Sequence, residues 1–119
     1  MNETSRLQKL VEEFAESVIR QTDAVATGDH QTGNRHAKRY IAAFEKLRAA
    51  GDVGREALVP LLRHRRADVR TMSATFLLRY KTEDALAVLR SEARGHGLVA
   101  FEASQAIKRW QAGEWALDE

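Results

Sequence analysis

The chain has 119 residues, which is enough for one hydrophobic core and too short for two ordinary ones. Apolar residues make up 44% and charged residues 30%, and the single proline and seven scattered glycines argue against disorder and against a turn-rich β fold. Cysteine is absent, which excludes disulfides, thiolate metal sites and a cysteine nucleophile.

No apolar run approaches the ~20 residues of a membrane span. The first six residues are polar and lead directly into an amphipathic pattern, unlike a signal peptide. We therefore predict a cytoplasmic protein with no membrane partner.

The net charge of +2 is unevenly distributed along the chain. Residues 1–34 carry a charge of −3, residues 35–109 carry +8, and residues 110–119 carry −3. A basic centre between acidic ends indicates either an anionic partner or ends that fold back and neutralise the middle.

The apolar spacing predicts a long antiparallel helical hairpin over residues 5–50. Its first helix runs from about Ser5, as the N-cap, to residue 26, and Gly28 with Asp29 breaks it. The second helix starts near Asn34 and ends before Gly51, a typical C′ glycine.

Residues 53–111 predict two shorter helical hairpins. Pro60 should bend or shorten the third helix, Asp68 opens a fourth over 67–80, Thr82 caps the fifth, and the sixth covers 98–111. Apolar positions in the two hairpins match at offsets of 28 and 30 residues, which indicates an internal repeat.

The apolar tail at 112–119 should dock onto the last hairpin through Trp115 and Leu117. The prediction for the whole chain, residues 1–119, is a single all-α domain of about six helices.

Asp68-Val69-Arg70, followed by small and then aliphatic residues, resembles the second helix of a HEAT-type repeat. Over residues 10–118 the chain is similar to a small bacterial family known as domain of unknown function two thousand and nineteen. The residues that carry this resemblance are Gln21, Ala24, Asn34-Arg35, Gly51, Leu58-Val59-Pro60-Leu61-Leu62, Asp68-Val69-Arg70, Ala103, Trp110 and Gly113-Glu114-Trp115-Ala116-Leu117-Asp118.

The resemblance implies HEAT-like stacked helical hairpins, an α–α superhelix, and no known activity. Related small helical proteins often accompany toxin genes, which suggests an immunity role as one version of the function. The basic centre does not suit an inhibitor of a toxin nuclease, because such nucleases are themselves usually basic.

We predict no catalytic, cofactor-binding or metal-binding residue and no cofactor. The four histidines, His30, His36, His64 and His96, are far apart and form no metal-ligand pair. The carboxylate clusters fit solvated helix positions, and no nucleophile elbow, P-loop or dinucleotide-binding fingerprint occurs. Trp110 and Trp115 fit core packing better than base stacking.

The best candidates for contacting a partner are the basic side chains at the centre of the chain, because arginine forks suit phosphates and carboxylates. These residues are Arg63, Arg65, Arg66, Arg70, Lys38 and Arg39. In the alternative interpretation Arg70 pairs internally, with Asp68 or with a glutamate of a neighbouring hairpin, and the other arginines are plain solvated charges.

We expect a non-catalytic, HEAT-like protein-interaction module that binds an acidic protein partner. The second hypothesis is a helical-repeat protein that binds nucleic acid through a basic central face.

Overall fold

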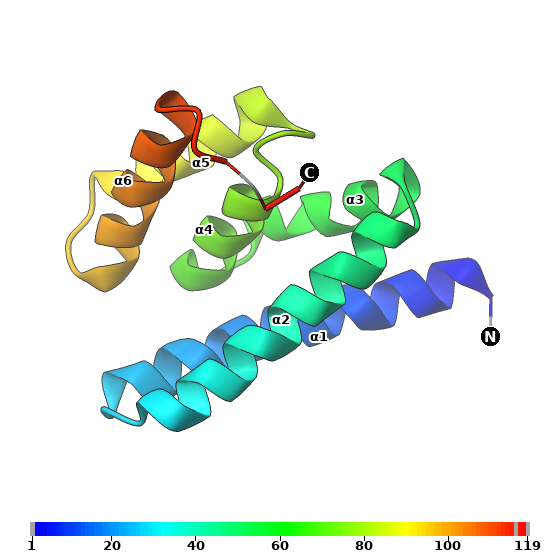
Figure 1. Cartoon of the computed structure of the whole chain (residues 1–119), viewed down its shortest axis with the longest axis horizontal. Helices are drawn as coiled ribbons and strands as arrows, with labels where there is room; N and C mark the ends of the chain where they lie inside the picture. The colour runs from blue at the N-terminus through cyan, green and yellow to red at the C-terminus, as the bar shows by residue number, and fades with distance from the viewer. Residues whose placement is uncertain (1, 116, 119) are drawn as a thin grey trace. The chain divides into compact units, whose positions relative to one another are not determined.

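The structure is a computed structural model, and it describes residues 2–115 together with residues 117 and 118. Within these residues the regular secondary structure is entirely helical, with six α-helices and one 3₁₀ helix (Figure 1). The all-α prediction is thereby confirmed. The chain divides into two compact units, residues 1–58 and residues 59–119.

The first unit is a hairpin of two long helices followed by a short third helix. Helix α1 spans Glu3–Ala26, α2 spans His30–Ala49, and α3 spans Asp52–Leu58. Helices α1 and α2 pack side by side along their length, as the blue and cyan ribbons of Figure 1 show. The predicted antiparallel hairpin is therefore present.

Apolar side chains at helical spacing fill the hairpin interface. Phe14 of α1 meets Tyr40 of α2 edge to face, with ring centroids 5.7 Å apart. The other buried apolar residues of α1 and α2 are Leu7, Leu10, Val11, Val18, Ala43, Phe44 and Leu47. Ile41, expected in this stripe, is 40% exposed.

Both long helices begin earlier than the sequence predicted. Asn2, and not Ser5, caps α1, since its side-chain oxygen accepts a hydrogen bond from the Ser5 amide at 2.8 Å. Asp29 caps α2 in the same way by accepting from the amide of Thr32 at 3.1 Å. Asn34 therefore lies inside α2, because a capping side chain close to the turn satisfies the free amides first.

Two glycines make the tight passage from α2 to α3 possible. Gly51 adopts φ +78°, the left-handed conformation predicted for the end of α2. Gly54 is buried, and a β-carbon built there would collide with the main-chain carbonyl of Leu47. Helix α3 can approach the end of α2 only because Gly54 has no side chain.

The second unit is built from shorter helices: the 3₁₀ helix η1 at Val59–Arg63, α4 at Ala67–Phe76, α5 at Thr82–Ala93 and α6 at Leu98–Gln111. Helix α4 packs against η1, α5 and α6, and α5 packs against α6. The core of this unit contains Leu61, Leu62, Val69, Ala74, Phe76, Leu77, Leu78, Ala85, Leu89, Ala100, Ala103 and Ala106.

Three local expectations for this unit need correction or refinement. Pro60 lies in the 3₁₀ helix directly after α3, which fits its missing amide donor and its predicted shortening effect. Helix α4 ends at Phe76, four residues before the predicted end at Tyr80. Thr82 is the first residue of α5 and not its cap, because its hydroxyl donates to the carbonyl of Leu78 at 2.6 Å.

Candidate functional site

The basic loop, residues Arg63–Arg66, joins η1 to α4. Its backbone is fixed by its own side chains, since the Arg66 amide donates to Nδ1 of His64 at 3.1 Å. Arg66 also forms a two-pronged contact with Asp68, with its Nε and Nη2 each 3.1 Å from one carboxylate oxygen. The side chain of Asp68 is buried and accepts a further hydrogen bond from the amide of Val69.

Arg70, one turn into α4, ties the loop to the rest of the second unit. Its Nε donates to the Glu92 carboxylate of α5 at 2.7 Å, and its Nη1 donates to the main-chain carbonyl of His64 at 2.8 Å. Both side chains of this ion pair are largely buried. Arg70 thus pairs with a glutamate of the neighbouring hairpin, as the alternative interpretation anticipated.

The remaining two arginines of the loop point into solvent. Arg63 and Arg65 are exposed, and neither side chain has a hydrogen bond or ion pair with any of the described residues. The internal contacts of Arg66 and Arg70 therefore hold a loop that presents two guanidinium groups outward.

Arg63 also borders a shallow groove between η1 and α5, which we name the η1 groove. Its volume is about 470 Å³, and its walls come mainly from Val59, Pro60, Leu62 and Val88. Asp84 supplies a carboxylate to the same groove. The arginine therefore lies beside apolar surface and an acidic group, and not on a uniformly basic face.

Lys38 and Arg39, the other two sequence candidates, are exposed on α2 in the first unit. Arg39 lines a polar groove of that unit together with Glu12, Glu13 and Glu16. Lys9 and Arg20 line the same groove, so this face of the hairpin carries charges of both signs.

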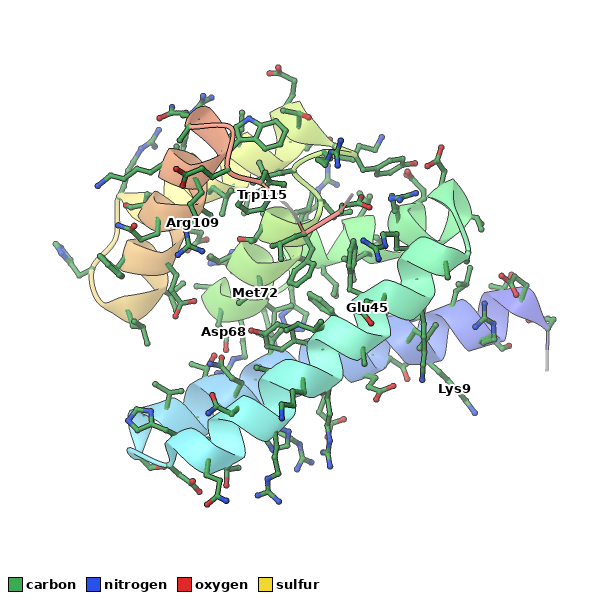
Figure 2. The ribbon with its side chains drawn as sticks, in the orientation of Figure 1. Lys9, Glu45, Asp68, Met72, Arg109 and Trp115 are labelled. Carbon is green, nitrogen blue, oxygen red and sulfur yellow. The ribbon has the colours of Figure 1, made fainter. Side chains whose placement is uncertain are left out.

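A second groove of the second unit lies between α4, α6 and the tail, and we name it the α6 groove. It measures about 420 Å³ and is mainly apolar, with Met72, Phe101, Trp115 and Leu117 among its walls. Figure 2 labels Met72 on α4, Arg109 on α6 and Trp115 on the tail, three segments that contribute to this groove.

The tail is held onto the second unit by one aromatic and one polar contact. Trp115 meets Trp110 edge to face, with centroids 6.2 Å apart, and Arg79 Nη1 donates to the carbonyl of Asp118 at 2.7 Å. Trp115 is partly buried, whereas Leu117 remains 38% exposed. Docking through Trp115 agrees with the expectation, and the second anchor is the backbone at Asp118 more than the side chain of Leu117.

Three charged residues line the α6 groove, namely Glu102, Arg109 and Glu114. Burial, followed by the nearby charge of Asp68, raises the pKa of the Glu102 carboxyl. Arg109 lies seven residues further along the same helix. Within residues 2–115, 117 and 118, neither side chain has a hydrogen bond or an ion pair.

Two buried donors near the same groove also lack a protein acceptor. Thr71 and Trp115 both line the groove, and neither Oγ1 of Thr71 nor Nε1 of Trp115 has a hydrogen-bond partner among the described residues. Unsatisfied buried polar atoms are uncommon in folded proteins. This groove therefore combines apolar walls with polar groups that the described chain does not satisfy.

No three histidine or carboxylate side chains of the described residues gather in a way that could hold a metal ion. None of the helices in the described part of the chain is long and apolar enough to cross a membrane. Comparisons with protein-family models, curated proteins and solved structures found no match for this chain.

Sequence reasoning missed the groove-lining residues Asp84, Phe101 and Glu102. A signal for Phe101 was available, since it lies on the side of α6 opposite the alanines at positions 100, 103 and 106.

Proposed function

We propose that this chain is a non-catalytic, HEAT-like protein-interaction module that binds an acidic segment of another protein at the basic loop and the η1 groove. The observation that carries the proposal is that two of the four arginines make internal contacts and the other two are exposed. Arg66 and Arg70 fix the loop through Asp68 and Glu92, and Arg63 and Arg65 are thereby presented to solvent.

A fixed loop favours binding because less conformational entropy is lost when a partner arrives. Guanidinium groups bind carboxylates with two parallel hydrogen bonds, so two presented arginines suit a segment with acidic side chains. The apolar walls of the η1 groove would receive an aliphatic side chain of the same segment.

The η1 groove favours a protein over a nucleic acid as the occupant. A phosphate backbone needs several cations along its path and gains nothing from apolar walls. Among its described lining residues the η1 groove offers Arg63 as its single cation, so it does not continue a path of positive charge for phosphates. Nucleic-acid binding is therefore the competing outcome of the test.

The test measures binding of two fluorescent probes, a short peptide rich in glutamate and leucine and a DNA duplex, at low and at moderate salt. We expect the wild type to bind the peptide, and the double variant Arg63→Ala/Arg65→Ala to bind it about ten-fold less tightly. Val88→Asp should also weaken binding, because it places a charge in the apolar wall.

The matched control is Arg6→Ala/Arg20→Ala, which removes the same charge from exposed positions of α1. It should leave the affinity unchanged. A further variant, Lys38→Ala/Arg39→Ala, tests whether α2 contributes. Equal peptide binding by the wild type and the loop variant would contradict the proposal, and tight binding of the duplex alone would replace it by the nucleic-acid hypothesis.

A further inference from the structure

One side of α6 carries a row of exposed or half-exposed residues, which we name the α6 stripe: Leu98, Phe101, Glu102, Gln105 and Arg109. Four of the five recur with the 4-3-4 spacing of a helix seam, and Phe101 lies beside them. The buried residues Ala100, Ala103 and Ala106 lie on the opposite or adjoining side of the helix, against the rest of the second unit.

The stripe exposes more apolar surface than an ordinary helix face does. Phe101 is 59% exposed and Leu98 is 52% exposed, and they lie three residues apart, so they form one patch at the start of α6. At the other end of α6 the groove walls are the apolar side chains of Trp115 and Leu117. The stripe thus carries an exposed apolar patch at the start of α6, and Phe101 of this patch also lines the α6 groove.

The stripe carries a negative charge near one end of α6 and a positive charge near the other. Glu102 is near the start of α6 and Arg109 near its end, about 10 Å apart along the helix axis. Neither side chain forms an ion pair with a described residue, although the Glu114 carboxylate lines the same groove as Arg109, and the Glu102 carboxylate is partly buried. The partly buried Glu102 carboxylate and the exposed Arg109 guanidinium are therefore both accessible to an opposite charge on a partner.

We propose that the α6 stripe is a self-complementary interface that pairs two copies of this chain about a twofold axis, with the two α6 helices antiparallel and crossing near Gln105. In this arrangement Glu102 of each copy faces Arg109 of the other, because a twofold axis makes every contact occur twice.

The same axis brings the exposed start of each α6 helix to the end of the other α6 helix. Phe101 of one copy reaches the groove beside Trp115 and Leu117 of its partner. A large, rigid aromatic side chain that enters an apolar groove is the usual anchor of such interfaces. A second copy therefore supplies the apolar filling and both opposite charges.

This interface differs from the basic loop and the η1 groove, so it goes beyond the proposed function. The two surfaces share no residue: the loop lies before α4 and borders α5, whereas the α6 groove is lined by α4, α6 and the tail. A failure of either proposal leaves the other intact.

The test is the concentration dependence of the molar mass of the full chain, measured by analytical ultracentrifugation. We expect the wild type to form a dimer. Each single charge reversal, Glu102→Arg or Arg109→Glu, should weaken the dimer at least ten-fold, because two like-charged contacts replace two attractive ones. The double variant Glu102→Arg/Arg109→Glu should restore dimerisation, since the contacts become attractive with exchanged sides.

Arg90→Glu is the matched control, because it makes the same change of charge as Arg109→Glu at an exposed position of α5 that lines neither groove. It should leave the dimer intact, whereas Phe101→Ser should dissociate it without unfolding a chain in which Phe101 is mostly exposed. Circular dichroism confirms folding, and Arg109→Glu and Phe101→Ser keep the test valid if Glu102→Arg fails to fold.

A wild type that stays monomeric at high concentration would overturn the proposal and leave the stripe to a different protein. A dimer that is indifferent to Phe101→Ser and to both single reversals would overturn it as well, because another surface would then hold the dimer. Failure of the double variant to recover would exclude the antiparallel pairing of Glu102 with Arg109.

Discussion

The two units of this chain differ in how far along the sequence their charged contacts reach. In the first unit Arg6 pairs with Glu3, Arg20 with Glu16 and Arg55 with Asp52, each three or four residues apart, and the first two pairs are exposed. In the second unit Arg70 reaches Glu92 in another helix, and Arg79 reaches the carbonyl of Asp118 in the tail.

Contacts within one helix do not affect how the elements pack, whereas contacts between elements hold distant segments of the chain together. Exposed pairs of neighbouring helix turns contribute only a few tenths of a kcal/mol, so the hairpin depends on its apolar interface. The long-range contacts of the second unit are partly buried and fix a loop and a tail, the two segments that border its grooves. Two grooves of the second unit therefore lie beside segments that long-range charged contacts hold in place.

The largest expected effect tests whether the stability of the first unit depends on close steric fit more than on charged contacts. Gly54→Ala should lower the free energy of unfolding by about 3 kcal/mol, because its β-carbon meets the main chain of Leu47 and the backbone must shift. Chemical denaturation measures the change. Gly95→Ala is the control, since Gly95 has ordinary dihedral angles and room for a methyl group, and it should be neutral or slightly stabilising. An equal effect of both changes would contradict the steric argument.

The next effect tests whether the tail belongs to the second unit. Trp115→Ala should cost about 2 kcal/mol, less than a fully buried tryptophan, because the side chain is only partly buried against Trp110. Leu117→Ser should cost much less, since that side chain is more than one-third exposed. Deleting residues 113–119 should cost at least as much as Trp115→Ala. A truncated chain that melts at the wild-type temperature would show that the tail contributes nothing.

A smaller effect measures the contrast between tertiary and local ion pairs directly. Arg70→Met should destabilise the chain by about 1.5 kcal/mol, because the Glu92 carboxylate and the His64 carbonyl both lose a charged donor. Arg20→Met removes an exposed pair with Glu16 and should change stability by less than about 0.5 kcal/mol. The urea midpoints of the two variants measure the two losses of stability. An equal loss for Arg20→Met and Arg70→Met would contradict the contrast between local and tertiary ion pairs.

The smallest effect concerns pH and lies in the first unit. Burial, followed by the positive charges of Arg39, Arg20 and Arg35, lowers the pKa of His36 below its ordinary value of 6.5. The unfolded chain therefore takes up the proton more readily. The contribution to stability is fully present above the ordinary pKa and is lost as the pH falls below it.

His36→Gln should accordingly lose less stability than the wild type between neutral pH and pH of about 5. Thermal melting of both proteins at the two pH values measures this difference. Parallel losses in the two proteins would assign the acid sensitivity to another group.

The sequence by itself determined the helices and most of the core. Helical spacing of apolar residues specifies α1, α2 and α6 because burial follows the 3.6-residue period, and glycines such as Gly51 end a helix wherever a left-handed residue is needed. The starts of the helices were predicted less well. Ser5 and Asn34 are residue types that often cap helices, but Asn2 and Asp29 are of the same kind, come earlier in the chain and are the residues that cap α1 and α2.

Only the tertiary structure decided what the charged residues do. Arg63, Arg65, Arg66 and Arg70 are indistinguishable in composition, and which of them meets a carboxylate depends on where α5 places Glu92 and on how the loop turns toward Asp68. The α6 groove likewise requires α4, α6 and the tail to meet. Helix formation is a local property of the chain, whereas pairing and exposure are set by residues distant in sequence, and so these surfaces emerged only once the elements were packed.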